Sequence, residues 1–169
     1  MYKRQLLSCL VAVVVFGCNT GAVPSSTVPP VLERYSGDGF SIGVPKPTGS
    51  EFRHVYLETS KIDGWHAALP GAPAFSVDVD PLPPEYQSLD GALRYPGKRY
   101  GLDYSDAVPV VLPAGSAYRF ERMVQTGGGY DPVRRVTYIF YNDGNSFNLT
   151  FGNMPPELEA QVASSLELF

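Results

Sequence analysis

Hydrophobic and polar residues alternate in several short segments of the first half of the chain, which is the pattern of strands with one buried face. The alternation is clearest where Phe40, Ile42 and Val44 precede Pro45, because proline cannot continue the hydrogen-bonding ladder of a strand. We expect further strands in EFRHVYLE (51–58), in the residues that follow an Asp63-Gly64 turn, and in FSVDVD (75–80).

The second half of the chain predicts an antiparallel meander. Its expected strands are AYRFERMVQ (117–125), VRRVTYIFY (133–141) and SFNLTF (146–151). The connecting stretches TGGGYDP and NDGN contain the glycines that hairpin turns require. In the last strand Phe147, Leu149 and Phe151 share one face, so we expect that face to lie in the core.

A helical period replaces the alternation in PPEYQSLDGALRYPG (83–97). Tyr86, Leu89 and Leu93 are spaced i, i+3, i+7 along it. Proline suits the first turn of a helix, and the Pro96-Gly97 pair is expected to end this one.

A second helix is predicted in NMPPELEAQVASSLELF (153–169). Asn153 is its expected cap, and the acidic residues Glu157 and Glu159 favour the positive end of the helix dipole. Its expected apolar face consists of Leu158, Val162, Leu166 and Phe169. The pattern as a whole predicts an α+β fold, an antiparallel sheet of about six strands with helices packed on it.

The N-terminal segment predicts export and lipid attachment. Leu6 to Phe16 is apolar but too short to cross a bilayer as a helix, which takes about 20 residues. Val15-Phe16-Gly17-Cys18 resembles the bacterial lipobox, which implies a signal peptide at 1–17 and a diacylglycerol on Cys18. MYKRQ (1–5) resembles the translated end of a transposon adapter, so the prediction is based on Leu6 to Cys18; the alternative is a chance cysteine after an ordinary signal peptide.

Residues 18–33 are rich in Ser, Thr, Pro, Gly and Val, the composition of a flexible tether. We expect a single folded domain at 34–169. The chain has 2 cysteines, and cleavage before Cys18 would leave one, so the domain is expected to have no internal disulfide.

The order of these elements resembles the PsbP-like family (PsbP/LpqN type), which includes extrinsic photosystem subunits and many bacterial lipoproteins. The resemblance rests on FSIGVP after the linker, a central helix, a meander containing YNDGNSFNLTF, and a last helix ending SLELF. It covers 34–169, and it departs from the family in placing the only tryptophan at Trp65. The resemblance implies an α/β/α sandwich and a non-catalytic module that binds or steadies a partner complex at a membrane.

Charge and motifs exclude several function classes. The net charge is −4 with no cluster of basic residues after the N-terminus, which argues against nucleic-acid binding. His54 and His66 are far apart, and no nucleophile elbow, C-x-x-C or phosphate loop is present, so we expect no enzyme and no cofactor. The glycines at 127–129 favour a hairpin over a phosphate site.

Acidic residues leave one metal-binding alternative open. Asp78 and Asp80 share a strand face and could hold a cation together with Asp103 or Asp106. Solvated carboxylates on a strand face are the commoner case, so we predict no metal site.

The segment RYPGKRYGLDY (94–104) is the strongest candidate for partner binding. It predicts a positive, aromatic loop on an acidic protein. The candidate residues are Arg94, Lys98, Arg99 and Tyr100. Basic residues at a helix C-terminus also interact with the helix dipole, so this interpretation stays open. Trp65 and His66 form a second candidate, although a lone tryptophan more often lies in the core.

These observations predict a monomeric bacterial lipoprotein on the cell membrane or outer membrane, facing the periplasm or the exterior. We expect it to act as a binding or assembly-accessory module for an envelope protein. The alternative is a lipoprotein that binds a small ligand or a metal.

Overall fold

The computed structural model describes residues 31–46, 52–57, 62–68, 74–101, 103–125 and 132–169. A large sheet contains β3 (Arg53–Leu57), β4 (Ile62–Ala68), β5 (Ala74–Pro81), β6 (Val108–Leu112), β7 (Gly115–Val124), β8 (Val133–Asn142) and β9 (Asn145–Gly152). A small sheet contains β1 (Leu32–Gly37), β2 (Phe40–Pro45) and β10 (Glu167–Leu168). The helices are a 3₁₀ turn, η2 (Pro84–Tyr86), α1 (Leu89–Tyr100) and α2 (Pro156–Ser164).

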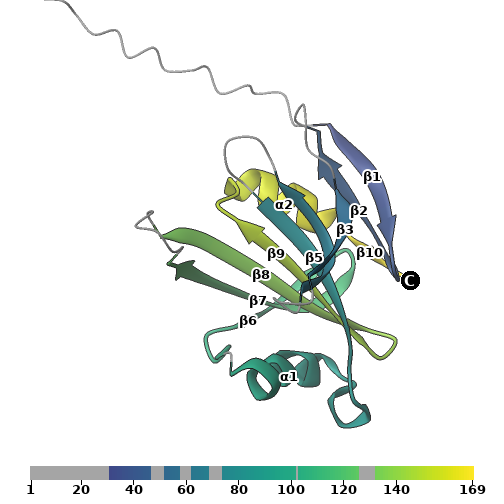
Figure 1. Ribbon diagram of the computed structural model, residues 1–169, viewed down its shortest axis with the longest axis vertical. Coiled ribbons are helices and arrows are strands. Elements are labelled where there is room, and N and C mark those ends of the chain that lie inside the picture. The colour runs from purple at the N-terminus through teal and green to yellow at the C-terminus, as the bar shows by residue number, and fades with distance from the viewer. Residues whose placement is uncertain (1–30, 47–51, 58–61, 69–73, 102, 126–131) are drawn as a thin grey trace, which may run out of the picture.

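Both sheets are antiparallel in all their strand pairs. The order of the large sheet is β3-β4-β5-β9-β8-β7-β6, and the order of the small sheet is β1-β2-β10. Figure 1 shows α1 below the large sheet, apart from α2 and the small sheet. The expected α+β class is therefore confirmed, with the strands divided between two sheets.

The two faces of the large sheet bury different sets of side chains, because successive residues of a strand point to opposite faces. One face packs against β2 and α2, with Phe147, Leu149 and Phe151 buried as expected. The other face packs against α1 through a smaller cluster that includes Phe120 and Ile139. Helix α1 contacts β7, β8 and β9, whereas α2 contacts β2.

The β8–β9 hairpin confirms the turn expected in NDGN. Asp143 and Gly144 both have positive φ, 41° and 79°, which is the conformation that a two-residue type I′ turn requires. The expected turn at Asp63-Gly64 is wrong. Both residues lie inside β4 and pair with Tyr56 and Val55 of β3.

The pattern of alternation missed three strands, β1, β6 and β10. Strand β1 begins at Leu32 and pairs with β2 along its whole length, so the folded domain starts within the expected tether. Strand β6 has a proline, Pro109, and lies at the edge of the large sheet. Edge strands tolerate proline because their outer backbone groups have no partner strand.

Helix α1 does not end at Pro96-Gly97, as we expected, but continues to Tyr100. Its first turn is capped by the hydroxyl of Ser88, which accepts a hydrogen bond of 2.9 Å from the Gly91 N–H. Gly101 ends the helix instead, since it adopts φ 68° and donates its N–H to the carbonyl of Gly97.

Helix α2 is shorter than predicted and ends at Ser164. Asn153 does not cap it; the residue has φ 55° and donates its backbone N–H to Arg134. Val162 and Leu166 are buried as expected. Phe169 is 71% exposed, because the chain has left the helix and entered β10 before it.

Candidate functional site

The outer surface of α1 carries three of the expected binding residues. Arg94, Lys98 and Arg99 are exposed on a helix and not on a loop, because α1 extends past Pro96. Tyr100 is the last residue of α1, and its side chain lies outside the described part of the structure. The structure therefore corrects the expected loop but brings these basic residues onto one short element.

Tyrosine rings hold two of these cations against the surface. The Lys98 ammonium lies 5.2 Å from the centroid of the Tyr86 ring, and the Arg99 guanidinium lies 5.8 Å from the centroid of the Tyr95 ring. The two rings lie 5.2 Å apart, centroid to centroid. A hydrogen bond with the Tyr86 hydroxyl raises the pKa of Lys98. The basic groups are thus positioned on aromatic rings in the geometry of cation–π contacts.

Arg94 and Arg99 differ in their ionic contacts. Arg99 forms an ion pair of 3.8 Å with Asp80, which connects α1 to β5. Arg94 donates to the carbonyl of Asp90, one turn earlier in its own helix, and forms no ion pair with any residue that the structure describes. The Arg94 charge is therefore available to a partner at the surface.

A shallow depression of about 300 Å³ lies beside these residues, and we call it the α1 groove. Its lining comes from α1 and the following loop: Leu93, Arg94, Gly97, Asp103, Tyr104 and Ser105. The Asp103 carboxylate accepts a hydrogen bond from the backbone N–H of Ser105, which lowers the pKa of Asp103. The Tyr104 ring lies 4.3 Å from that of Phe120, so the groove wall is attached to the sheet.

Trp65 and His66 do not belong to this surface. Trp65 is half-buried among the aromatic rings of Phe40, Phe52 and His54 and packs against the core on the α2 side of the large sheet. Its Nε1 is buried and has no hydrogen-bond partner in the described part of the chain. His66 pairs through its backbone with Arg53 and Ser76, and its side chain lies outside the described set. Trp65 is therefore a core residue.

The acidic residues proposed as an alternative cation site do not converge. Asp78 accepts a hydrogen bond from Ser76, and Asp80 pairs with Arg99. Within residues 31–46, 52–57, 62–68, 74–101, 103–125 and 132–169, no group of three or more His, Cys, Asp or Glu side chains could hold a metal ion. Asp78, Asp80, Asp103 and Asp106 therefore do not form a joint metal site.

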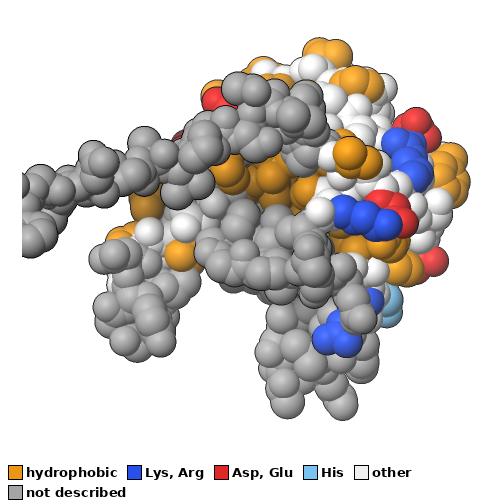
Figure 2. All heavy atoms as spheres, turned by 90° about the horizontal axis from the view of Figure 1, so that it is seen from above, with side chains coloured by type: hydrophobic (Ala, Val, Ile, Leu, Met, Phe, Trp, Pro, Cys, Tyr) orange, Lys and Arg blue, Asp and Glu red, His pale blue; other side chains and the backbone are white. Residues whose placement is uncertain are grey.

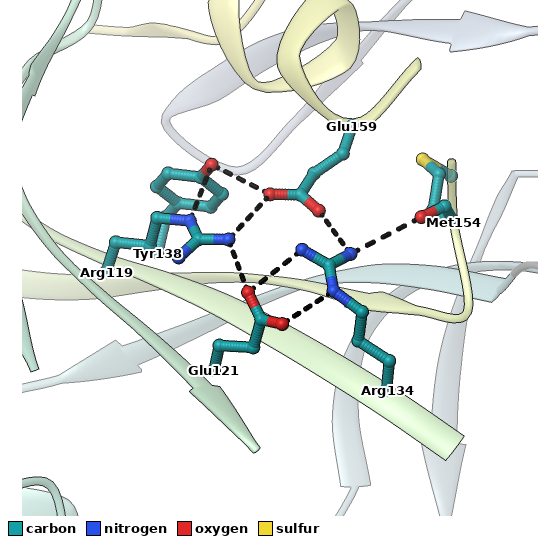
Figure 3. A network of polar contacts seen from close by, with 6 residues as sticks. All are labelled: Arg119, Glu121, Arg134, Tyr138, Met154 and Glu159. Carbon is teal, nitrogen blue, oxygen red and sulfur yellow. Dashed lines mark hydrogen bonds and ion pairs between the residues drawn. The ribbon is translucent and has the colours of Figure 1, made fainter. Parts of the chain in front are cut away.

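A second polar cluster connects α2 to the opposite face of the large sheet (Figure 3). Glu159 of α2 is only 3% exposed and accepts a hydrogen bond of 2.9 Å from the Tyr138 hydroxyl. Its carboxylate also lies 2.9 Å from Arg134 and 3.5 Å from Arg119. We call these residues, together with Glu121, the Glu159 network.

The Glu159 network is balanced in charge. Glu121 accepts hydrogen bonds from both arginines, from Arg134 through two nitrogens, and these bonds lower the pKa of Glu121 to about 2. The same contacts raise the pKa of Arg134. Two arginines meet two carboxylates, so we assign the network to the attachment of α2 to the sheet. The sequence predicted Glu159 only as a favourable charge at the helix start.

Basic and acidic side chains also lie side by side in one part of the surface seen from above in Figure 2, at the right-hand side of the view. The ion pairs of the small sheet, Arg34 with Glu167 and Lys46 with Glu33, follow the same arrangement. The α1 surface differs, because Arg94 and Lys98 form no ion pair with a described residue, although the charge of Glu85 contributes to the raised pKa of Lys98.

Known structures have the same fold. The chain superposes on the solution structure of cyanobacterial PsbP (CyanoP) from Synechocystis sp. PCC 6803 with a TM-score of 0.56 and 16% identity, covering 85% of this chain and 96% of that one. The expected PsbP-like fold is therefore confirmed.

Two further structures are similar to the chain. A protein from Bacteroides thetaiotaomicron VPI-5482 matches with a TM-score of 0.55 and 15% identity over 80% of this chain, which spans about half, 48%, of the length of that one. LpqN of Mycobacterium tuberculosis, described as involved in cell envelope biogenesis, gives a TM-score of 0.40 and 13% identity over 86% of this chain and 87% of its own. Neither a protein-family model nor a curated protein matches the sequence.

Neither helix in the described part of the chain is long and apolar enough to cross a membrane. Cys18, the expected lipidation residue, lies outside the described residues.

Proposed function

We propose that this protein is a membrane-anchored lipoprotein of the bacterial cell envelope, where it acts as a non-catalytic binding or assembly-accessory module. The observation that carries this proposal is the surface of α1. Arg94, Lys98 and two tyrosine rings form a basic, aromatic surface on a chain with a net charge of −4. Arginine and tyrosine are enriched at protein interfaces relative to the rest of protein surfaces.

The shape of the surface supports protein binding over small-ligand binding. Sites for small ligands are concave and bury most of the ligand. The α1 groove is shallow, and its lining combines one basic, one acidic and one aromatic side chain with an exposed serine. The described lining contains no histidine or cysteine that could act as a base or a thiol nucleophile.

The place of action follows from Cys18. A lipid-anchored Cys18 holds the domain on a membrane through a tether, so the domain acts at the surface of the envelope, facing the periplasm or the exterior. The partner is therefore an envelope protein, and the domain binds it as a monomer.

Site-specific photo-crosslinking in intact cells tests the binding surface. A photoreactive amino acid replaces Arg94 or Lys98, and the matched control replaces Glu157, which is exposed on α2. We expect Arg94 and Lys98 to give the same crosslinked envelope protein, identified by mass spectrometry, and Glu157 to give none. The same crosslinked protein from Glu157 as from Arg94 and Lys98, or no crosslinked protein from Arg94 and Lys98, would contradict the proposal.

Membrane attachment is tested by Cys18→Ser. Because the thioether needs the sulfur, this variant should leave the membrane fraction and lose labelling by a radioactive or alkyne-tagged fatty acid. Ser8→Ala in the signal segment is the control and should leave the membrane association and the fatty-acid labelling unchanged. A Cys18→Ser variant that stays lipid-labelled contradicts the lipobox prediction.

A further inference from the structure

The strand pair β7–β8 places two arginines directly opposite each other. Arg122 and Arg135 are partners in the antiparallel register, so their side chains leave the same face of the large sheet. This face packs against α1. Phe120 lies two residues before Arg122 on β7 and Ile139 lies four residues after Arg135 on β8, so both point to the same face as the arginines, and both belong to the cluster under α1. Like charges at directly opposed positions destabilise a sheet, so the pair is unexplained by the stability of the fold.

Neither arginine forms an ion pair with a carboxylate of the described residues, although the charge of Arg122 contributes to the lowered pKa of Asp103. The Arg122 guanidinium donates to the carbonyl of Asp103 at 2.6 Å and lies 4.8 Å from the ring centroid of Phe120 and 5.3 Å from that of Tyr104. Arg135 is exposed and forms no hydrogen bond, ion pair or ring contact with any other described residue.

The same two strands carry arginines on the opposite face that are fully paired. Arg119 and Arg134 each meet both carboxylates of the Glu159 network. Arginines on β7 and β8 therefore form ion pairs on the α2 face, whereas Arg122 and Arg135 on the α1 face form none with the described residues of this chain.

Arg122 and Arg135 lie next to the α1 groove. Tyr104 lines the groove and stacks against Arg122, and Asp103 of the same lining supplies the carbonyl that Arg122 binds. Burial raises the pKa of Tyr104, and the charges of Arg122 and Arg135 oppose that rise, which agrees with their proximity to this ring. Arg94, which also lines the groove, adds a third positive charge.

We propose that Arg122 and Arg135, together with the α1 groove, bind an acidic, extended segment of the partner protein. The inference rests on the proposed function and names the chemistry of the partner. Opposed side chains of antiparallel strands begin roughly 5 Å apart, and alternate residues of an extended segment are about 7 Å apart on one side. Two carboxylates at alternate positions of such a segment can therefore each pair with one guanidinium.

The geometry favours carboxylates of a protein over other anions. The Arg122 guanidinium packs beside the adjoining rings of Tyr104 and Phe120 and donates to the Asp103 carbonyl, so its planar group is held in one place where it can also bind a carboxylate. The partly exposed Arg122 and the exposed Arg135 lie beside a shallow groove, which suits an extended chain. A phosphate group on its own would gain little burial there.

The test uses the full chain in detergent micelles and a fluorescent peptide with glutamate at alternate positions. We expect the peptide to bind, and Arg122→Gln and Arg135→Glu each to weaken the affinity about tenfold, since one charge-assisted pair contributes on the order of 1.4 kcal/mol. The same peptide with glutamine in place of glutamate should not bind. Lys46→Glu makes the same change of charge as Arg135→Glu on the small sheet and should leave the affinity unchanged.

A thermal unfolding measurement on each variant separates binding from folding. Arg135→Glu removes the like-charge pair, so its unfolding temperature should equal or exceed that of the parent chain. Equal peptide affinity in the parent and both arginine variants would overturn the inference. The inference would also be overturned if the peptide did not bind and if inorganic phosphate or phosphatidylglycerol vesicles bound with an affinity that falls in both arginine variants. Crosslinking from α1 with no peptide binding would overturn the acidic-segment inference alone.

Discussion

At the scale of single residues, Glu159 is the carboxylate on which the attachment of α2 depends. It is almost fully buried and is shared by Arg119, Arg134 and Tyr138. Glu159→Gln should lower the free energy of unfolding by about 2 to 4 kcal/mol, because it removes the buried one of the two carboxylates that neutralise Arg119 and Arg134. Urea unfolding measures the change.

Glu157→Gln, two residues earlier and exposed, is the matched control and should change stability by less than about 0.5 kcal/mol. Similar losses in the two variants would show that the Glu159 network does not hold α2.

Glu121 gives the same network a pH dependence. Its pKa falls from an ordinary value of 4.5 to about 2 because Arg134 and Arg119 bind the ionised form. A carboxyl whose pKa is lower in the folded state stabilises the fold above its unfolded pKa and loses this contribution as the pH falls. Stability should therefore decline between pH 4.5 and about pH 2, and Glu121→Gln should flatten that part of the curve. Thermal unfolding at a series of pH values tests this, and an unchanged slope in the variant would contradict it.

The Glu159 network could not be predicted from the sequence, because its residues are far apart in the chain. Arg119 and Arg134 are 40 and 25 residues from Glu159, and only the packing of α2 on the sheet brings the three together. The α1 basic residues could be singled out as binding candidates because they are neighbours in sequence, and the structure shows that they are exposed. Arg122 and Arg135 were not singled out, since their opposition depends on the β7–β8 register.

At the scale of elements, the segment after α2 should be as sensitive to truncation as the helix itself. Val162 of α2 and Leu166 before β10 are both buried. Val162→Ala and Leu166→Ala should each cost on the order of 2 to 4 kcal/mol, whereas the exposed Ser164→Ala should be nearly neutral. Chemical denaturation of the three variants checks this, and equal effects would mean that the assigned buried face is wrong.

Strands in which apolar and polar residues alternate could be predicted from the sequence, whereas the edge strand β6 could not. Strands β5 and β9 place their large apolar residues on one face, so their sequences alternate, whereas β8 is buried on both faces from Val136 to Phe140. Strand β6, VPVVL, leaves Val108 and Val111 exposed and thus gives no alternation to detect. The end of α1 was misplaced because Gly97 and Gly101 are both plausible in sequence, and only the positive φ of Gly101 identifies the C-terminal cap.

At the scale of the whole molecule, the domain should be complete from residue 31. Strand β1 pairs with β2 throughout, and Leu32 and Tyr35 pack against the main core. A fragment of residues 31–169 should unfold cooperatively at the same temperature with and without a chelator, while a fragment of residues 38–169 should unfold at a clearly lower temperature. Differential scanning calorimetry tests both. A large effect of the chelator would favour the metal-binding alternative.

The small sheet joins parts of the chain that are synthesised at very different times. Ser41 of β2 donates a hydrogen bond to Glu167 of β10, 126 residues later. Until β10 leaves the ribosome, β2 has an open edge, and the place of Leu166 in the core is unfilled. Contacts between such distant residues form late in folding. We therefore expect the small sheet and the main core to remain incomplete until Leu166 and β10 have been synthesised.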